Sequence, residues 1–188
     1  MLDLLRPFAY LTVQHPSRLP LWVNWLLPLA LAALAIFGLG KLGDTVNIFA
    51  EQGLLDRLLG FIQTLTGFYI AALAAVSSFN SPHLDRTMPE PAPRMTIKYN
   101  GVLQTIAATR RRFLTSMFAY LTALSFVFSL AAIAVLSLAT PLGQALAPSV
   151  VVVGHWLLAF GFLFIAFQLA CVTFWGLFYL GERMLTPD

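Results

Sequence analysis

Five basic residues gather around the point where a proline-rich segment near the middle of the chain ends: Arg94, Lys98, Arg110, Arg111 and Arg112. A guanidinium group is planar and donates paired hydrogen bonds that match two oxygens of a phosphate, whereas a lysine ammonium acts as a point charge. The cluster therefore indicates a binding site for a polyanion such as a nucleotide or an oligonucleotide. A second interpretation stays open, because a triple arginine beside an apolar run also anchors a helix at a membrane face and contacts anionic lipid.

Polar side chains inside the long apolar stretches form a second group of candidates. As candidates for lining a pore we take Gln63, Tyr69, Thr115, Thr122, Ser129 and Gln168. Thr115, Thr122 and Ser129 recur every seven residues and therefore share one stripe of a helix. A polar group is costly in lipid and normally faces water or a hydrogen-bond partner. The pattern predicts either the wall of a pore formed by several subunits or hydrogen bonds between packed helices.

The sequence offers no set of residues suited to catalysis or to metal binding. Its three histidines, His15, His83 and His155, lie on separate segments, and no acidic residue falls inside the apolar runs. The single cysteine, Cys171, lies within the fourth run, so neither a disulfide framework nor a cysteine metal site is expected. Enzymes of the hydrolase and transferase classes need a nucleophile with a base, paired carboxylates or metal ligands. We therefore expect a protein that is not an enzyme and holds no metal or cofactor.

The elements that position these residues are four apolar runs, at residues 21–39, 58–79, 113–138 and 150–180. An α-helix rises 1.5 Å per residue and the hydrocarbon core of a bilayer is about 30 Å thick, so about 20 apolar residues span it. The composition agrees, with 59% hydrophobic and only 10% charged residues. The sequence predicts an all-α integral membrane protein with four transmembrane helices.

The distribution of cations predicts the orientation of these helices. Nine of the eleven Lys and Arg residues fall on the two termini and on the segment around residues 80–112. The stretch between the third and fourth runs carries no charge. By the positive-inside rule, both termini and the central segment face the cytoplasm. We expect a multi-pass protein of the bacterial inner (plasma) membrane, in contact with membrane lipid.

The chain divides into four parts. Residues 1–20 are expected to form an interfacial arm, and residues 21–79 the first two spans with an outer loop at 40–57. Residues 80–95 contain four prolines and read as an extended cytoplasmic connector without a helix of its own. Residues 96–188 are expected to hold the last two spans, with one continuous helix over 96–138 whose first turns extend into the cytoplasm. Pro141 and Pro148 are expected to confine the outer turn to about ten residues.

Small residues in the spans favour close packing of helices. In the second run, Gly67, Ala71 and Ala75 recur at intervals of four, a pattern that lets helix backbones approach each other. Four spans with little soluble mass make a slim monomer. We therefore expect a homo-oligomer, in which the basic cluster would repeat around an axis as an electropositive vestibule.

Three short patches stand out together with the size and span layout of the chain: Arg6-Pro7-Phe8-Ala9-Tyr10-Leu11, Gln14-His15-Pro16 and Arg110-Arg111-Arg112-Phe113-Leu114. With these features the chain resembles small multi-span membrane effector proteins of bacterial anti-phage defence systems. In that class, a nucleotide or oligonucleotide holds the membrane protein closed or opens it, and the protein permeabilises the inner membrane on infection. The resemblance implies that the basic cluster is the ligand site, that the polar stripes line the pore, and that a nucleotidyltransferase is a partner.

The sequence leaves two functions to compare. One is an oligomeric pore-forming effector gated by an anionic ligand on its cytoplasmic face. The other is a non-catalytic membrane scaffold or accessory subunit of a transporter or assembly complex. An effector should harm the cell when its ligand control is removed, whereas a scaffold should co-purify with a different protein.

Overall fold

The computed structural model describes residues 2–15, 18–42, 46–88, 92–99 and 102–180. Within this part, four helices are long and apolar enough to cross a membrane: Leu19–Leu42, Leu54–Ser78, Arg110–Ala145 and Pro148–Phe178. Each coincides with one of the four apolar runs. The ends agree within a few residues, except that the third helix continues to Ala145. The prediction of a mainly helical chain with four such helices is therefore confirmed.

The first span consists of three consecutive segments: α1 (Leu19–Leu21), the π-helix η2 (Trp22–Leu26) and α2 (Leu27–Leu42). At the end of η2, the N–H of Leu27 donates to the carbonyl of Trp22, five residues earlier, where an α-helix would use the fourth. Pro28 follows and has no N–H to donate to the carbonyl of Asn24. The first span is therefore a helix with an irregularity near its start.

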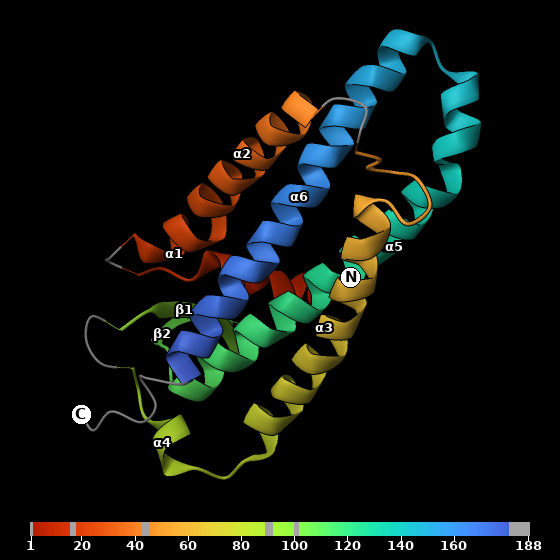
Figure 1. The fold of residues 1–188 in the computed structure, drawn as a ribbon. Helices are drawn as coiled ribbons and strands as arrows, with labels where there is room; N and C mark the ends of the chain where they lie inside the picture. Colours follow the sequence, from red (N-terminus) through yellow and green to blue (C-terminus); the bar gives the residue numbers. More distant parts are fainter. Residues whose placement is uncertain (1, 16–17, 43–45, 89–91, 100–101, 181–188) are drawn as a thin grey trace.

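Helices α3 (Leu54–Ser78), α5 (Arg110–Ala145) and α6 (Pro148–Phe178) pack beside one another, and α2 packs against α6 (Figure 1). The buried side chains of α5 form the centre of the core and include Phe113, Leu114, Met117, Phe118, Leu121 and Phe128. In contrast, α2 buries only Pro28 and Ala32. The first span is therefore held at the side of the bundle by a narrow apolar face.

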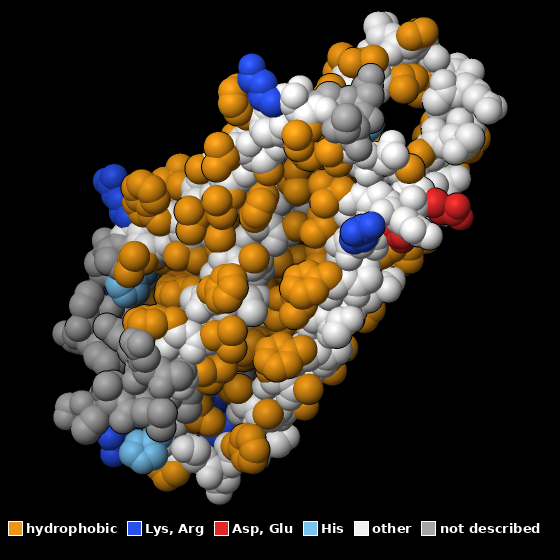
Figure 2. Space-filling view, viewed as in Figure 1, with side chains coloured by type: hydrophobic (Ala, Val, Ile, Leu, Met, Phe, Trp, Pro, Cys, Tyr) orange, Lys and Arg blue, Asp and Glu red, His pale blue; other side chains and the backbone are white. Residues whose placement is uncertain are grey.

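Charged residues mark both ends of the apolar part of α3. Asp56 and Arg57 lie at its start, and Arg111 contacts the carbonyl of Val76 near its end. From Arg57 to Val76 the helix rises about 28 Å, close to the ~30 Å thickness of the hydrocarbon core. Hydrophobic side chains also spread over α2 and α6 on the face shown in Figure 2. This part of the bundle matches one bilayer in height.

The hairpin of α5 and α6 extends past the level at which α3 begins (Figure 1). Ala132 is the last buried residue of α5 and Ala159 is the first buried residue of α6. The predicted ten-residue outer turn is wrong, because α5 continues through Pro141 to Ala145 and α6 begins at Pro148. A proline inside an exposed helix removes one backbone hydrogen bond without ending the helix here, and a proline suits the first position of the next helix.

A β-hairpin replaces the predicted cytoplasmic extension of the third span. Strands β1 (Arg94–Tyr99) and β2 (Val102–Ala107) pair antiparallel, with Tyr99 opposite Val102, so the predicted continuous helix is wrong before Arg110. The strands are rich in β-branched residues, and the sequence between them is Asn100-Gly101. An Asn-Gly pair between two such segments is a strong hairpin signal. This signal outweighs the helix propensity that favoured an extension of α5.

The proline-rich connector also departs from the prediction. Residues Pro82–Asp85 form a short helix, α4, although the connector is expected to have none. Pro82 occupies its first turn, where the missing N–H of a proline costs no hydrogen bond. The connector therefore places Asp85 on a defined element near the start of α5.

Candidate functional site

Backbone hydrogen bonds join several segments at the end of the bundle where α5 begins. Gln14, which follows the 3-10 helix η1 (Leu2–Thr12), exchanges two hydrogen bonds with Arg94 at the start of β1, at 3.1 and 2.8 Å. The N–H of Arg110 donates to the carbonyl of Arg86 at 3.1 Å. We refer to this end, formed by η1, α4, β1 and β2, as the hairpin end.

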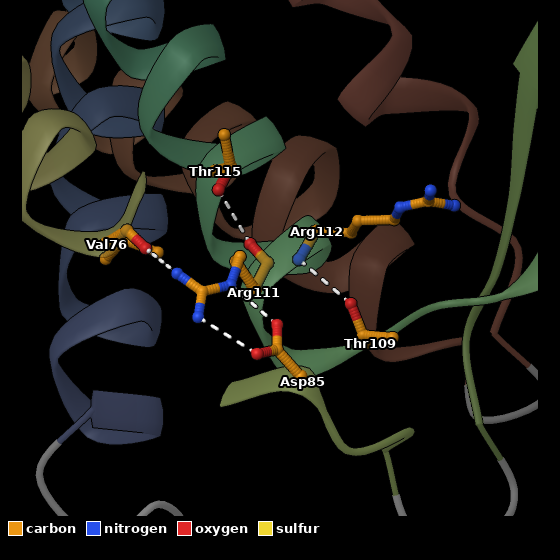
Figure 3. Close-up of polar contacts among 6 residues, drawn as sticks. All are labelled: Val76, Asp85, Thr109, Arg111, Arg112 and Thr115. Atoms are coloured by element: carbon orange, nitrogen blue, oxygen red, sulfur yellow. Dashed lines mark hydrogen bonds and ion pairs between the residues drawn. The ribbon is translucent and has the colours of Figure 1, made fainter. Parts of the chain in front are cut away.

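Arg111 joins three helices at the hairpin end (Figure 3). Its guanidinium donates to both carboxylate oxygens of Asp85 in α4, at 2.7 and 3.2 Å, and to the carbonyl of Val76 at 2.7 Å. Val76 lies in the last turn of α3, where a carbonyl has no partner within its own helix. Hydrogen bonds from Arg111 lower the pKa of the Asp85 carboxyl, so this group is charged at neutral pH. Arg111 therefore connects α3, α4 and α5.

The other four candidate ligand residues occupy different environments. Arg112 is exposed, and its side chain points away from the pair of Arg111 and Asp85 (Figure 3). Arg94 is exposed on β1, and Arg110 is only 4% exposed. The backbone of Lys98 pairs with Leu103 in the hairpin, and its side chain lies outside the described part. Arg94 and Arg112 are thus the members of the cluster whose described side chains are exposed.

The hairpin end is the more basic end of the bundle. Its described segments carry the cations Arg6, Arg18, Arg86, Arg94, Lys98, Arg110, Arg111 and Arg112, against the acids Asp3 and Asp85. At the opposite end, Lys41 and Arg57 accompany Glu51 and Asp56. The cations thus concentrate on one side of the apolar band, where an anionic group would be attracted.

Most of the candidate pore residues have partners inside the chain. The hydroxyls of Tyr69 and Thr173 lie 2.6 Å apart and join α3 to α6, while Thr173 donates to the carbonyl of Leu169 at 2.6 Å. Thr115 and Thr122 each donate at 2.8 Å to the carbonyl four residues earlier in α5. Ser129 is half-buried on the same helix. These hydroxyls serve helix packing or their own helix in this conformation.

Gln168 stabilises the irregularity in the first span. Its side-chain N–H donates to the backbone carbonyl of Asn24 at 2.6 Å, and both residues are 3% exposed. In a regular α-helix, this carbonyl would accept from the N–H at position 28, which Pro28 lacks. A buried carbonyl without a donor is costly, above all in lipid. The Gln168 side chain therefore replaces the missing backbone hydrogen bond.

The side chain of Asn24 extends this buried polar group to the N-terminal arm. The Tyr10 hydroxyl donates to Asn24 Oδ1 at 3.4 Å. The Tyr10 ring is 1% exposed and stacks on Tyr120 of α5, with centroids 5.1 Å apart. We refer to Tyr10, Asn24, Pro28 and Gln168 as the Asn24 node. It joins the arm, the first span and α6.

Gln63 differs from the other candidates because it is exposed within the apolar part of α3. The same face of α3 presents small residues at intervals of three and four, all of them exposed: Gly60, Thr64, Gly67, Ala71 and Ala74. Apart from the neighbouring backbone of α3 itself, a Cβ atom added at Gly60 or Gly67 would meet no atom within 4 Å. This surface, which we call the α3 face, is therefore open to another molecule.

Sequence reasoning missed Tyr10, Asn24 and Asp85. The position of Pro28, four residues after Asn24, is a sequence signal for a carbonyl that needs another donor. Nothing local indicates that Asp85 pairs with Arg111, because 26 residues separate them. Both contacts depend on how the helices assemble.

The described residues show no metal site, and a cavity that some of them line lies away from the candidate residues. Within them, no group of three or more His, Cys, Asp or Glu side chains is placed to hold a metal ion. A cavity of about 320 Å³ lies at the opposite end, lined in part by Asn47, Phe49, His155 and Trp156. Comparison with protein-family models found no matching family, and searches of curated proteins and solved structures found no similar protein.

Proposed function

We propose that this chain is a non-catalytic membrane effector that assembles into a pore and is controlled by an anionic ligand at its hairpin end. The exposure of Gln63 in the apolar part of α3 is the observation that supports this most directly. An amide carries two N–H donors and a carbonyl acceptor, which lipid tails cannot satisfy. In an assembly, the α3 face would meet a neighbouring subunit or water, and the amide would have partners.

A second copy of the chain is the partner that best fits the α3 face. An amide is both donor and acceptor, so Gln63 of one copy can bond to Gln63 of another. The small residues beside it allow two helices to approach closely, as interfaces in membranes commonly require. Polar atoms of Gln63 and Thr64 at the edge of such an interface would then border the conducting path.

The ligand in this proposal is a nucleotide or oligonucleotide, supplied by a partner nucleotidyltransferase in anti-phage defence. This choice of ligand is supported by the concentration of cations at the hairpin end and by the resemblance to membrane effectors of such systems. Arg94, Lys98 and Arg112 are the proposed contacts, since Arg111 is engaged with Asp85. From the positive-inside rule we expect the hairpin end to face the cytoplasm, where such a ligand is made.

A non-conducting scaffold is the second candidate. It is favoured by the hydrogen bonds that satisfy Tyr69, Thr115, Thr122 and Gln168 within one chain. These residues then contribute to a stable bundle, and the α3 face remains as an exposed polar surface in the described part of the band. A scaffold would use this face to hold a different membrane protein.

Substitutions on the α3 face should weaken self-association. Gln63→Leu removes the amide, and we expect roughly a threefold to thirtyfold loss of association, since hydrogen bonds between membrane helices are worth about 0.6–2 kcal/mol. Gly67→Leu should reduce it further, because the added side chain keeps two helices apart. Subunit counting by single-molecule photobleaching in liposomes measures both. Gln144→Leu, the same change on an exposed residue of α5 beyond the apolar core, is the control. Unchanged association in both α3 variants would reject this interface.

Removing single cations at the hairpin end should weaken anion binding. We expect Arg94→Ala, Lys98→Ala and Arg112→Ala each to lower the affinity for a fluorescent oligoribonucleotide several-fold and to reduce its salt dependence. The matched control is Arg57→Ala, at the opposite end of α3. Titrations at two salt concentrations, in nanodiscs of neutral lipid, measure both quantities. Binding to anionic vesicles without binding to the oligonucleotide would favour the membrane-anchoring role of these residues.

A further inference from the structure

We infer that the N-terminal arm is a latch that transmits the state of the hairpin end to the first span. This inference rests on the proposed function, because it names the helix that responds to the ligand. Three observations support it. The arm is hydrogen-bonded to the β-hairpin, its Tyr10 belongs to the Asn24 node, and α2 beyond that node buries few side chains. They describe one connected path from β1 to α2.

The first link joins the hairpin to the arm. Gln14 and Arg94 share two backbone hydrogen bonds, so a movement of β1 is transmitted to Gln14. Arg94 is also an exposed cation of the proposed ligand site. A phosphate that draws Arg94 toward itself therefore acts on the residue to which the arm is bonded.

The second link joins the arm to the first span. Tyr10 is the arm residue four positions before Gln14. It is buried against α5, where its ring also lies 6.1 Å from that of Phe113. Burial raises the pKa of the Tyr10 hydroxyl, which therefore remains a neutral donor to Asn24 at physiological pH. Withdrawal of the arm would remove both the ring and the hydroxyl from the Asn24 node.

The third link is the helix that the node supports. The π-helix η2 and Pro28 interrupt the regular hydrogen bonding of the first span at Asn24, and such irregularities are common positions of bending. Beyond them, α2 packs on α6 and leaves large side chains such as Leu34 and Phe37 exposed, at 67% and 64%. When the arm leaves, α2 can tilt on α6 while α3, α5 and α6 keep their packing.

Distances between spin labels test the latch in the full-length protein. In a Cys171→Ala background, labels at Phe37→Cys and Phe61→Cys report α2 against α3, and labels at Phe61→Cys and Phe126→Cys report α3 against α5. These three positions are exposed. In phosphatidylethanolamine–phosphatidylglycerol liposomes, we expect Tyr10→Ala and Gln14→Pro to add a second, displaced α2–α3 distance and to leave the α3–α5 distance unchanged. Leu5→Ala, on an exposed residue of the arm, should match the parent.

A single label at Leu5→Cys reports whether the arm has been released. A mobile arm with an unchanged α2–α3 distance would overturn the latch, as would an arm that stays immobile in both variants. If Tyr10→Ala also shifts the α3–α5 distance, the loss of the ring has disturbed the bundle itself. The latch is then judged from Gln14→Pro and from Tyr10→Phe, which keeps the ring. The release of a dye trapped inside the same liposomes is recorded in parallel. Movement of α2 without release contradicts the pore and supports the latch, whereas release without movement contradicts the latch.

Discussion

Gln168→Leu is expected to destabilise the folded protein by about 1–2 kcal/mol, which is a roughly fivefold to thirtyfold change in the unfolding equilibrium. Leucine is similar in size but lacks the amide, whose N–H serves the carbonyl of Asn24. Pro28 has no N–H and so cannot take over as the donor to that buried carbonyl. Reversible unfolding in mixed micelles of increasing SDS content measures the change, with Gln144→Leu as the control on an exposed residue.

A double-mutant cycle with Pro28→Ala tests the stated cause. Alanine at position 28 restores a backbone N–H four residues after Asn24, so Gln168 is no longer needed as the donor. In this background we expect Gln168→Leu to cost less than about 0.5 kcal/mol, which gives a coupling free energy near 1 kcal/mol. An equal cost in both backgrounds would show that Gln168 stabilises the bundle by packing alone.

Arg111→Ala is expected to separate α4 and the connector from the ends of α3 and α5. One guanidinium supplies the hydrogen bonds to Asp85 and to the carbonyl of Val76, so all of them are lost together. Arg111→Lys should rescue only in part, because a lysine cannot donate in the planar paired geometry. Limited proteolysis at residues 80–93 and labelling of His83→Cys should both accelerate. Arg112→Ala, on the exposed neighbour, is the control, and equal rates in Arg111→Ala and the control would contradict the role of Arg111 in joining the three helices.

The same pair predicts a pH dependence with a defined sign. Arg111 lowers the pKa of the Asp85 carboxyl in the folded protein, so the pair stabilises the junction fully above the ordinary pKa of 3.8. As the pH falls through the lowered pKa, the carboxylate is protonated and this contribution is lost. Protection of the connector should therefore be constant near neutral pH and decrease only in acid, and Asp85→Asn should remove this acid transition.

The four helices were predictable because length and apolarity alone determine whether a helix can cross a bilayer. The β-hairpin is not predicted, since the residues after Arg94 include good helix formers, and their propensity favours a continuous helix despite the local signal of Asn100-Gly101. The course of α5 through Pro141 is not predicted either, because a proline usually marks the end of a helix. A proline is a strong breaker in water, but a long exposed helix tolerates the loss of one hydrogen bond.

The candidate site was predictable as a list of residue types and not as an arrangement. A guanidinium serves equally well as a ligand contact or as an interhelical clamp, and only the position of Asp85 distinguishes the two for Arg111. Likewise, Gln63 and Gln168 are chemically identical residues in apolar runs. The rotation of α3 exposes one and that of α6 buries the other against Asn24. Helix rotation depends on packing across the whole bundle, which no local pattern specifies.

Electrical recording on the purified protein in planar bilayers tests the central proposal most directly. With the oligoribonucleotide added to the side that carries the hairpin end, we predict discrete current steps that depend on the ligand. Gln63→Leu should make the current steps less frequent, because it weakens assembly. Arg94→Ala should raise the ligand concentration that is needed to produce them. A parent protein that assembles and binds the oligoribonucleotide but never conducts, with or without ligand, would contradict the pore and favour the scaffold.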